Sequence, residues 1–332
     1  MSGKEFNYLL ILFLILFPHP SFSDELFSFH QVLMGTMVGV TLIGKDRGMA
    51  EKAALQAFQE IRRIEQLMSP WIDRSDVFRI NQSAGRQWVH VSSETLYVIT
   101  KSIEMSKRSD GGFDITVGPL IEIWRKARGK GVPPSEEELK RSLDLVGYSN
   151  ILIDPGGKVF LKKEGMSIDL GGIAKGYAVD RAFEILKRLG YRNLIVNAGG
   201  DLRLEGTKFG QPWSIGIQDP RKPEKIIARI SLTKGALATS GDYEKYFIYQ
   251  GKRYHHILNP RDGLPAEGCQ SVSVLTKEGI IADAMATAVF VLGPKKGYSL
   301  CDSMERINCL IIERGGKKII TPGLKNRISF TP

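Results

Sequence analysis

The segment IDLGGIAKGYAVD, residues 168–180, joins an apolar, strand-like stretch to an amphipathic helix through a pair of glycines. We expect this helix to reach about Leu189 and to stop at Gly190, because glycine readily adopts the left-handed conformation at helix ends. Gly171 and Gly172 let the backbone approach a bulky ligand, and the N–H groups at the helix start favour an anion. A tight strand-to-helix turn would need the same glycines, so the motif alone leaves both interpretations open. Its spacing matches neither the P-loop nor the Rossmann fingerprint.

The sequence on both sides of this segment predicts pairs of strands, with helices between the pairs. Apolar residues recur at helical spacing over residues 46–68 and 93–107, and Ser135 with Glu138 forms a capping box for a short helix. Other patterns favour strands or hairpins in residues 31–43, 151–163, 193–206, 213–218, 226–232 and 246–256. Residues 280–293 are predicted to form a buried helix. Because no regular βαβ alternation is present, the sequence predicts an α+β fold with mostly antiparallel sheets and flanking helices.

The N-terminus differs from the rest of the 332-residue chain. Residues 9–17 are an unbroken apolar run, and small residues precede a candidate cleavage site after Ser23. The run is shorter than the about 20 residues that a membrane span needs, so residues 1–23 are predicted to be a cleaved secretory signal. We therefore expect export to the periplasm or the outer face of the inner membrane, with an uncleaved anchor as the alternative. No cysteine lies near Ser23, so a lipid anchor is not expected. Residues 24–332 are expected to form one domain.

The formal net charge is +10, and a basic protein can favour anionic membranes, nucleic acid or phosphate-bearing ligands. No basic block is interleaved with aromatic residues, so nucleic-acid binding is not expected. The three cysteines, Cys269, Cys301 and Cys309, include no CxxC pair that would indicate zinc. Cys301 and Cys309 could form a disulfide in an exported protein, or they could be buried thiols.

Asp283 and Thr287 lie four residues apart in an otherwise apolar helical segment, and therefore on one helical face. A carboxylate there is costly to bury unless it is paired or coordinates a metal. A threonine hydroxyl one turn along adds a second oxygen ligand, and oxygen ligands suit magnesium bound to substrate phosphates. The alternative is that Asp283 caps the helix and Thr287 belongs to the core.

His255 and His256 are adjacent in a predicted extended stretch, so their side chains point to opposite faces and make a poor shared zinc site. One of them could act as a general base near neutral pH, although a lone histidine is more often structural. Nucleophile-elbow and metalloprotease-helix motifs are absent from the sequence. The residues thus favour a phosphate-bearing ligand with magnesium.

Seven motifs, taken in order, resemble the ApbE-type FAD:protein FMN transferase family. The resemblance runs from Met34 to about Leu324 through MGT, GGFDITVGPL, IDLGGIAKGYAVD, NAGGDL, ATSGDYEKYF, HHILNPRDG and ADAMATA. It implies Mg²⁺-dependent transfer of FMN from FAD to a threonine or serine hydroxyl of an acceptor flavoprotein, with release of AMP. It also implies that the FAD and Mg²⁺ site lies in a cleft between lobes.

The resemblance further implies roles for individual residues. His256 would be the catalytic base, and Mg²⁺ would be held by the backbone carbonyl of Ala174 with Asp283 and Thr287, which makes Asp283 essential to catalysis. The implied FAD contacts are Met34, Trp71, Gly112, Phe113, Asp114, Gly171, Lys175, Tyr177 and Ile257. The family commonly has aspartate where this chain has Asn259 and threonine where it has Asp262, and we expect activity despite both changes.

The expected partner is an acceptor flavoprotein subunit of a membrane redox complex, and peripheral association with the inner membrane is a further hypothesis. Some relatives hydrolyse FAD to FMN and AMP, which is the nearest alternative activity. A non-catalytic flavin-binding carrier and a nucleotide-dependent oxidoreductase are alternatives from other classes. Release of AMP would distinguish an enzyme from a carrier.

Overall fold

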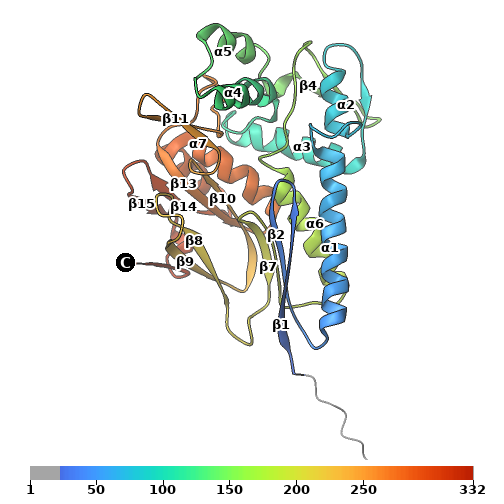
Figure 1. Cartoon of the computed structure of the whole chain (residues 1–332), viewed down its shortest axis with the longest axis vertical. Helices are drawn as coiled ribbons and strands as arrows, with labels where there is room; N and C mark the ends of the chain where they lie inside the picture. Colours follow the sequence, from blue (N-terminus) through green and yellow to red (C-terminus); the bar gives the residue numbers. More distant parts are fainter. Residues whose placement is uncertain (1–22, 332) are drawn as a thin grey trace, which may run out of the picture.

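An eight-stranded sheet forms the centre of the structure. The computed structural model describes residues 23–331, and within them the strand order of this sheet is β1-β2-β6-β7-β10-β13-β14-β15, antiparallel throughout (Figure 1). Its strands are β1 (Glu25–Leu33), β2 (Thr36–Gly44), β6 (Leu194–Ala198), β7 (Asp201–Glu205), β10 (Lys234–Gly241), β13 (Cys269–Thr276), β14 (Asn308–Glu313) and β15 (Lys318–Ile320). Neighbouring strands therefore bring distant chain segments together.

One face of this sheet is covered by the long helices α1 (Arg47–Met68), α6 (Ala174–Arg188) and α7 (Gly279–Ser303) (Figure 1). The buried residues of α1 recur every three or four positions, as the sequence pattern predicts, and Asp46 caps the helix by accepting a hydrogen bond from Met49 N at 2.7 Å. The part of α7 before Gly293 is almost entirely apolar and buried between α6 and the sheet, and the helix bends at Gly293, next to Pro294.

The opposite face carries a small sheet of β8 (Trp213–Gln218), β9 (Ile226–Leu232) and β16 (Ile328–Phe330). Their apolar side chains form a second core with Leu204, Leu237 and Leu310 of the central sheet. Because β7, β10, β13 and β14 are packed on both faces, they form the middle layer of a three-layer structure.

The remaining elements gather beyond one end of the sheet, at the top of Figure 1. They comprise α2 (Asp76–Gln82), α3 (Ser93–Arg108), η1 (Ile115–Val117), α4 (Gly118–Lys130), α5 (Glu136–Leu143), η2 (Tyr148–Asn150) and the small sheet β3 (Val89–His90), β5 (Lys158–Leu161), β4 (Ile151–Ile153). The hairpin β11 (Tyr246–Tyr249) and β12 (Lys252–His255) precedes a loop that begins at His256, and η3 (Pro322–Leu324) precedes β16. Trp124 of α4 packs with Leu258, which joins this group to that loop.

The predicted α+β class is confirmed, and so are the predicted hairpins and the capping box of Ser135 and Glu138. The helices α2 and α4 and the strands β10 and β13 were not predicted. Cys301 and Cys309 are free, buried thiols, and their mutual hydrogen bond raises the pKa of Cys309. Within residues 23–331 no helix is both long and apolar enough to cross a membrane. The predicted signal lies almost wholly outside the described residues.

Candidate active site

The opening segment, residues 168–180, lies where α6 and α7 begin beside each other. A Cβ atom at Gly176 would lie 2.2 Å from the carbonyl oxygen of Gly279, so only glycine permits this approach. Asp180 of α6 caps α7, because its carboxylate accepts hydrogen bonds from Gly279 N at 2.8 Å and Ile280 N at 3.0 Å. Asp283 therefore does not cap its own helix, and the capping alternative for this residue is wrong.

Asp283 is buried at the start of α7 and has two partners from α6. One carboxylate oxygen accepts a hydrogen bond from Gly176 N at 3.0 Å, and the other lies 3.8 Å from Lys175 Nζ. Lys175 also forms an ion pair with Asp201 of β7. Burial raises the pKa of Asp283, whereas for Lys175 the carboxylates of Asp283 and Asp201 outweigh burial and raise the pKa of the amine. Lys175 thus stays charged between the two acidic side chains.

The hydrogen bond from Gly176 N to Asp283 leaves the carbonyl of Gly172 without a partner among residues 23–331. In a helix that carbonyl would accept from the amide four residues later, which here is Gly176 N. A Cβ atom at Gly172 would lie 3.3 Å from Thr287 Oγ1, so Thr287 approaches this turn closely, and Ser240 Oγ lies 3.3 Å from the same hydroxyl. The start of α6 thus has a backbone carbonyl without a hydrogen-bond partner, the Asp283 carboxylate bound to Gly176 N, and the Thr287 and Ser240 hydroxyls near Gly172.

These oxygen donors fit a hard cation such as Mg²⁺. Within the described part of the chain, no group of three or more His, Cys, Asp or Glu side chains is arranged to hold a metal. A cation at this place would therefore need hydroxyl and carbonyl ligands beside Asp283. The carbonyl of Ala174 lies in the first turn of α6, where the helical pattern directs it to an amide one turn later. The carbonyl oxygen of Gly172 has no hydrogen-bond partner among residues 23–331, so it is more available to a cation than that of Ala174.

The two adjacent histidines differ in environment, as their opposite directions predict. His255 is buried, its Nε2 lies 2.9 Å from the carbonyl oxygen of Ala266, and its Nδ1 accepts from Ile257 N at 3.3 Å. The His256 side chain is exposed, yet crowding by protein atoms and the nearby charges of Lys245 and Lys175 lower its pKa. Solvent screens part of this effect, but its direction keeps the imidazole neutral at pH 7.

The loop after α3 places three predicted FAD contacts, Gly112, Phe113 and Asp114, near the same turn. Phe113 is buried, and its ring lies 3.2 Å from where a Cβ of Gly172 would be. Asp114 is buried, and both of its carboxylate oxygens accept hydrogen bonds. One accepts from the amide and hydroxyl of Thr116, and the other accepts from Tyr148 N at 2.9 Å. Its carboxylate thus stabilises the loop itself. Gly112 packs against α7, where its Cβ would lie 2.8 Å from a side-chain carbon of Leu292.

Four other predicted contacts come from separate elements. Met34 occupies the turn of the β1–β2 hairpin with a positive φ of 51°, and Ile257 is buried directly after His256. Trp71 is 60 % exposed in the loop after α1, with the guanidinium of Arg125 4.8 Å from its ring centre. Gly171 is exposed at the helix start, where its N–H donates to Asp169 at 2.7 Å.

Tyr177, another predicted FAD contact, packs between α6, α3 and α1. It lies two positions after Lys175 on α6 and therefore on the opposite helical face. Its hydroxyl donates to Glu94 of α3 at 2.9 Å, in a cluster with Arg63 of α1. Burial and this hydrogen bond raise the pKa of Tyr177. The residue fixes α6 against α1 and α3, away from Lys175 and Asp283.

The structure also adds site residues that the sequence did not single out: Asp201, Asp169, Lys245 and Ser240. Asp201 holds Lys175, and Lys245 lies close enough to Asp169 and His256 to influence the pKa of both. Asp201 belongs to the NAGGDL motif and Lys245 to ATSGDYEKYF, so these two motifs could have indicated both residues as site candidates. Their roles become visible only when the strands are placed side by side.

Comparison with known proteins gives a consistent result. The family model described as "ApbE family" matches residues 34–311. The chain is 31% identical to an FAD:protein FMN transferase of Klebsiella pneumoniae over 93% of this chain and 95% of that protein. It is 33% identical to an FAD:protein FMN transferase of Vibrio cholerae, over 81% of this chain and 82% of that one.

Solved structures agree with the sequence matches. The ApbE protein of Thermotoga maritima superposes with a TM-score of 0.84 at 37% identity, covering 91% of this chain and 99% of that one. The flavin transferase ApbE of Vibrio cholerae gives a TM-score of 0.82 at 29% identity, covering 92% and 100% of the two chains. Motifs, site and fold therefore lead to one conclusion: the chain belongs to the ApbE family.

Proposed function

We propose that this enzyme transfers FMN from FAD to a threonine or serine hydroxyl of an acceptor flavoprotein. The observation that carries the proposal is the group of residues at the start of α6. Lys175 lies between Asp201 and Asp283, Thr287 approaches Gly172, and Lys175 is close enough to the neutral His256 to influence its pKa. The activity named for the relatives of Klebsiella pneumoniae and Vibrio cholerae supports the same reaction.

In the proposed reaction the acceptor hydroxyl attacks the phosphorus of the FMN half of FAD. The new P–O bond joins FMN to the protein, the bond to the AMP phosphate breaks, and AMP leaves with the electron pair. The neutral imidazole of His256 takes the hydroxyl proton. Lys175 and Lys245 place positive charge near His256, where they would attract the diphosphate and stabilise negative charge during the displacement.

We propose Mg²⁺ as the cation that Asp283, Thr287 and a backbone carbonyl would hold, with Ala174 and Gly172 as the candidates for that carbonyl. When bound, Mg²⁺ would neutralise charge on the diphosphate. Asp283 is held in place by Gly176 N, and Lys175 is held by Asp201, so the charged groups are positioned before substrate arrives. All the predicted FAD contacts remain part of this proposal: Met34, Trp71, Gly112, Phe113, Asp114, Gly171, Lys175, Tyr177 and Ile257.

Incubation of the purified protein with FAD, Mg²⁺ and a candidate acceptor flavoprotein should produce covalent flavin fluorescence on the acceptor band of a denaturing gel. Free AMP should appear in equal amount, because one AMP leaves for each FMN transferred. FMN supplied in place of FAD should give no labelled band, since it lacks the phosphate bond that must break. AMP and free FMN without labelled acceptor would instead identify an FAD hydrolase.

We also propose that the protein is exported, with residues 1–23 as the signal and acceptor subunits of membrane redox complexes as partners. Mass spectrometry of the exported protein should find an N-terminus at or near Asp24, because the apolar run and the small residues before it fit a signal-peptidase site. An intact Met1 in that fraction would identify the segment as a membrane anchor. The net charge of +10 supports work near an anionic membrane.

A further inference from the structure

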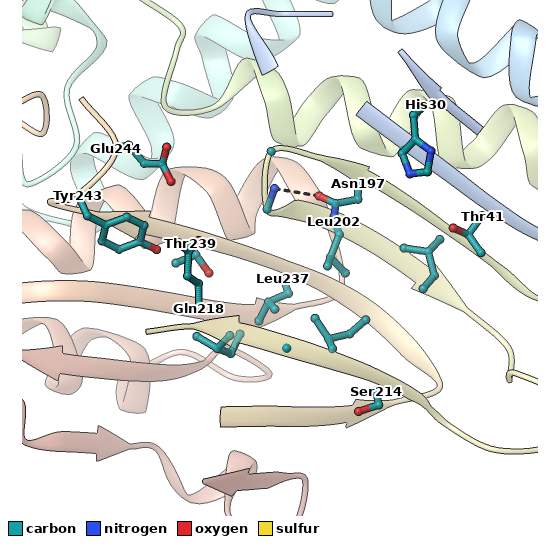
Figure 2. A pocket seen from close by; sticks show the side chains of 17 residues that line it. His30, Thr41, Asn197, Leu202, Ser214, Gln218, Leu237, Thr239, Tyr243 and Glu244 are labelled. Atoms are coloured by element: carbon teal, nitrogen blue, oxygen red, sulfur yellow. Dashed lines mark hydrogen bonds between the residues drawn. The ribbon is translucent and has the colours of Figure 1, made fainter. Parts of the chain in front are cut away.

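A groove of about 380 Å³ lies between the outer face of the central sheet and β8 (Figure 2). The sheet side includes Thr41 of β2, Asn197 of β6 and Thr239 of β10, and Ser214 marks the β8 side. β8 and β9 pack on β7, β10, β13 and β14 in a core that also includes Ile43 of β2 and Ile195 of β6, whereas Thr41 of β2 and Asn197 of β6 line the groove. The groove is therefore bounded by a sheet face and by a strand.

β8 presents its backbone edge to this groove. Five consecutive residues, 214–218, line it. Side chains alternate between the two faces of a strand, so consecutive residues can share one pocket only along the edge of the strand. β8 is also the outer strand of its sheet, and among residues 23–331 its second edge pairs with no other strand. Its unused N–H and C=O groups thus point toward the groove.

The β8 edge lacks the features that normally prevent strand addition. Its sequence, WSIGIQ, contains no charged residue and no proline, and Ser214, Gly216 and Gln218 are exposed. Proteins usually protect free edges with lysine, proline or a covering element, because an open edge pairs readily with another extended chain. An unprotected edge beside an open groove is typical of a site that binds an extended peptide.

One end of the groove adjoins the candidate active site. Gly199 and Gly200 line the groove and lead directly into Asp201, the partner of Lys175. The side chain of Asn197 accepts a hydrogen bond from Gly200 N at 2.9 Å, drawn as a dashed line in Figure 2, and so fixes this turn. Glu244 lies at the same end and is close enough to Lys175 to help raise its pKa.

We propose that this groove binds an extended segment of the acceptor flavoprotein as an added strand along β8, with its hydroxyl delivered past Gly200 to the site at Lys175 and His256. This inference rests on the proposed function, because it identifies where the protein substrate of that reaction is held. Backbone pairing supplies affinity, and the uncharged polar side chains of Thr41, Asn197 and Thr239 in the lining can contact polar groups of that segment.

The decisive comparison uses Ser214→Arg and Ser231→Arg. The two serines face each other across the β8–β9 pair and are both exposed, but only Ser214 lines the groove. With an acceptor that the wild-type protein labels, Ser214→Arg should raise the KM for acceptor about tenfold or more, a typical cost of losing a docking contact. The KM for FAD and the kcat should change little, and Ser231→Arg should match the wild type throughout.

Hydrogen exchange provides a second measurement on the unmodified enzyme. Addition of the acceptor should slow exchange of amides in Trp213–Gln218, because those that face the groove gain a hydrogen-bond partner, while Ile226–Leu232 should change little. Equal acceptor KM values for both arginine variants, or unchanged exchange in β8, would overturn the groove proposal alone. Failure of the wild-type protein to label any acceptor would overturn the proposed function itself. Protection of β8 that depends on enzyme concentration without acceptor would assign the edge to a second copy of this chain and overturn the proposal.

Discussion

Asp283→Ala is expected to abolish flavin transfer while the protein remains folded. The variant removes the carboxylate that would hold Mg²⁺ and leaves Lys175 paired only with Asp201. Two opposing effects act on stability. The variant removes the unfavourable burial of a carboxylate, which raises the pKa of Asp283 in the wild type. It also leaves Gly176 N without its acceptor, which costs about 1–3 kcal/mol. We therefore expect a small net change in the free energy of unfolding rather than a marked gain.

Asp283→Asn is the matched control for this result. Its amide oxygen can still accept the hydrogen bond from Gly176 N, so the fold should be preserved, but the neutral side chain is a poor Mg²⁺ ligand. We expect Mg²⁺ to raise the Tm of the wild type in the presence of FAD, and both variants should lose this rise. Thr287→Val should give a milder loss, because a water can replace the hydroxyl. Native single-turnover rates in Asp283→Asn would exclude the metal-ligand role.

His256→Ala is expected to slow single-turnover transfer by about 10²–10⁴-fold while FAD still binds, because loss of a general base has an effect of this size. Flavin fluorescence titration would measure binding, and rapid-quench gel assays would measure transfer. His255→Ala provides the contrast. That ring contacts Ala266 and Ile257 inside the protein, so its removal should cost about 1–3 kcal/mol of stability without a comparable loss in rate. An unchanged rate in His256→Ala would remove this residue from the base role.

The pH dependence gives an independent readout for His256. Its pKa lies below the ordinary value of about 6.5, so the free enzyme keeps a neutral imidazole through neutral pH. The acid limb of kcat/KM for the wild type should therefore fall below pH 6.5. The imidazole of His256 binds a proton more readily in the unfolded chain than in the folded one. The free energy of unfolding therefore decreases as the pH falls from the unfolded pKa toward the folded pKa of this residue. His256→Ala should remove this part of the acid sensitivity.

Central strands show why part of the fold could not be predicted. Every residue of β13 is buried, so the strand lacks the alternation that marks a strand with one solvent face. β10 reads KGALATSG and consists mainly of small residues that do not favour strands by themselves. Both strands are stabilised by layers packed on their two faces, and such packing is not encoded in local sequence spacing.

The sequence by itself determined the α+β class, the helices at α1, α3, α5 and α6, and the motifs that identify the family. Periodicity, capping and glycine stops act over a few residues, which is why a local pattern predicts them. Only the tertiary structure decided that Asp180 caps α7 across 99 residues, that Lys175 lies between Asp201 and Asp283, and that Tyr177 faces away from them. These contacts depend on how strands pair and helices pack, and therefore on residues far apart in the chain.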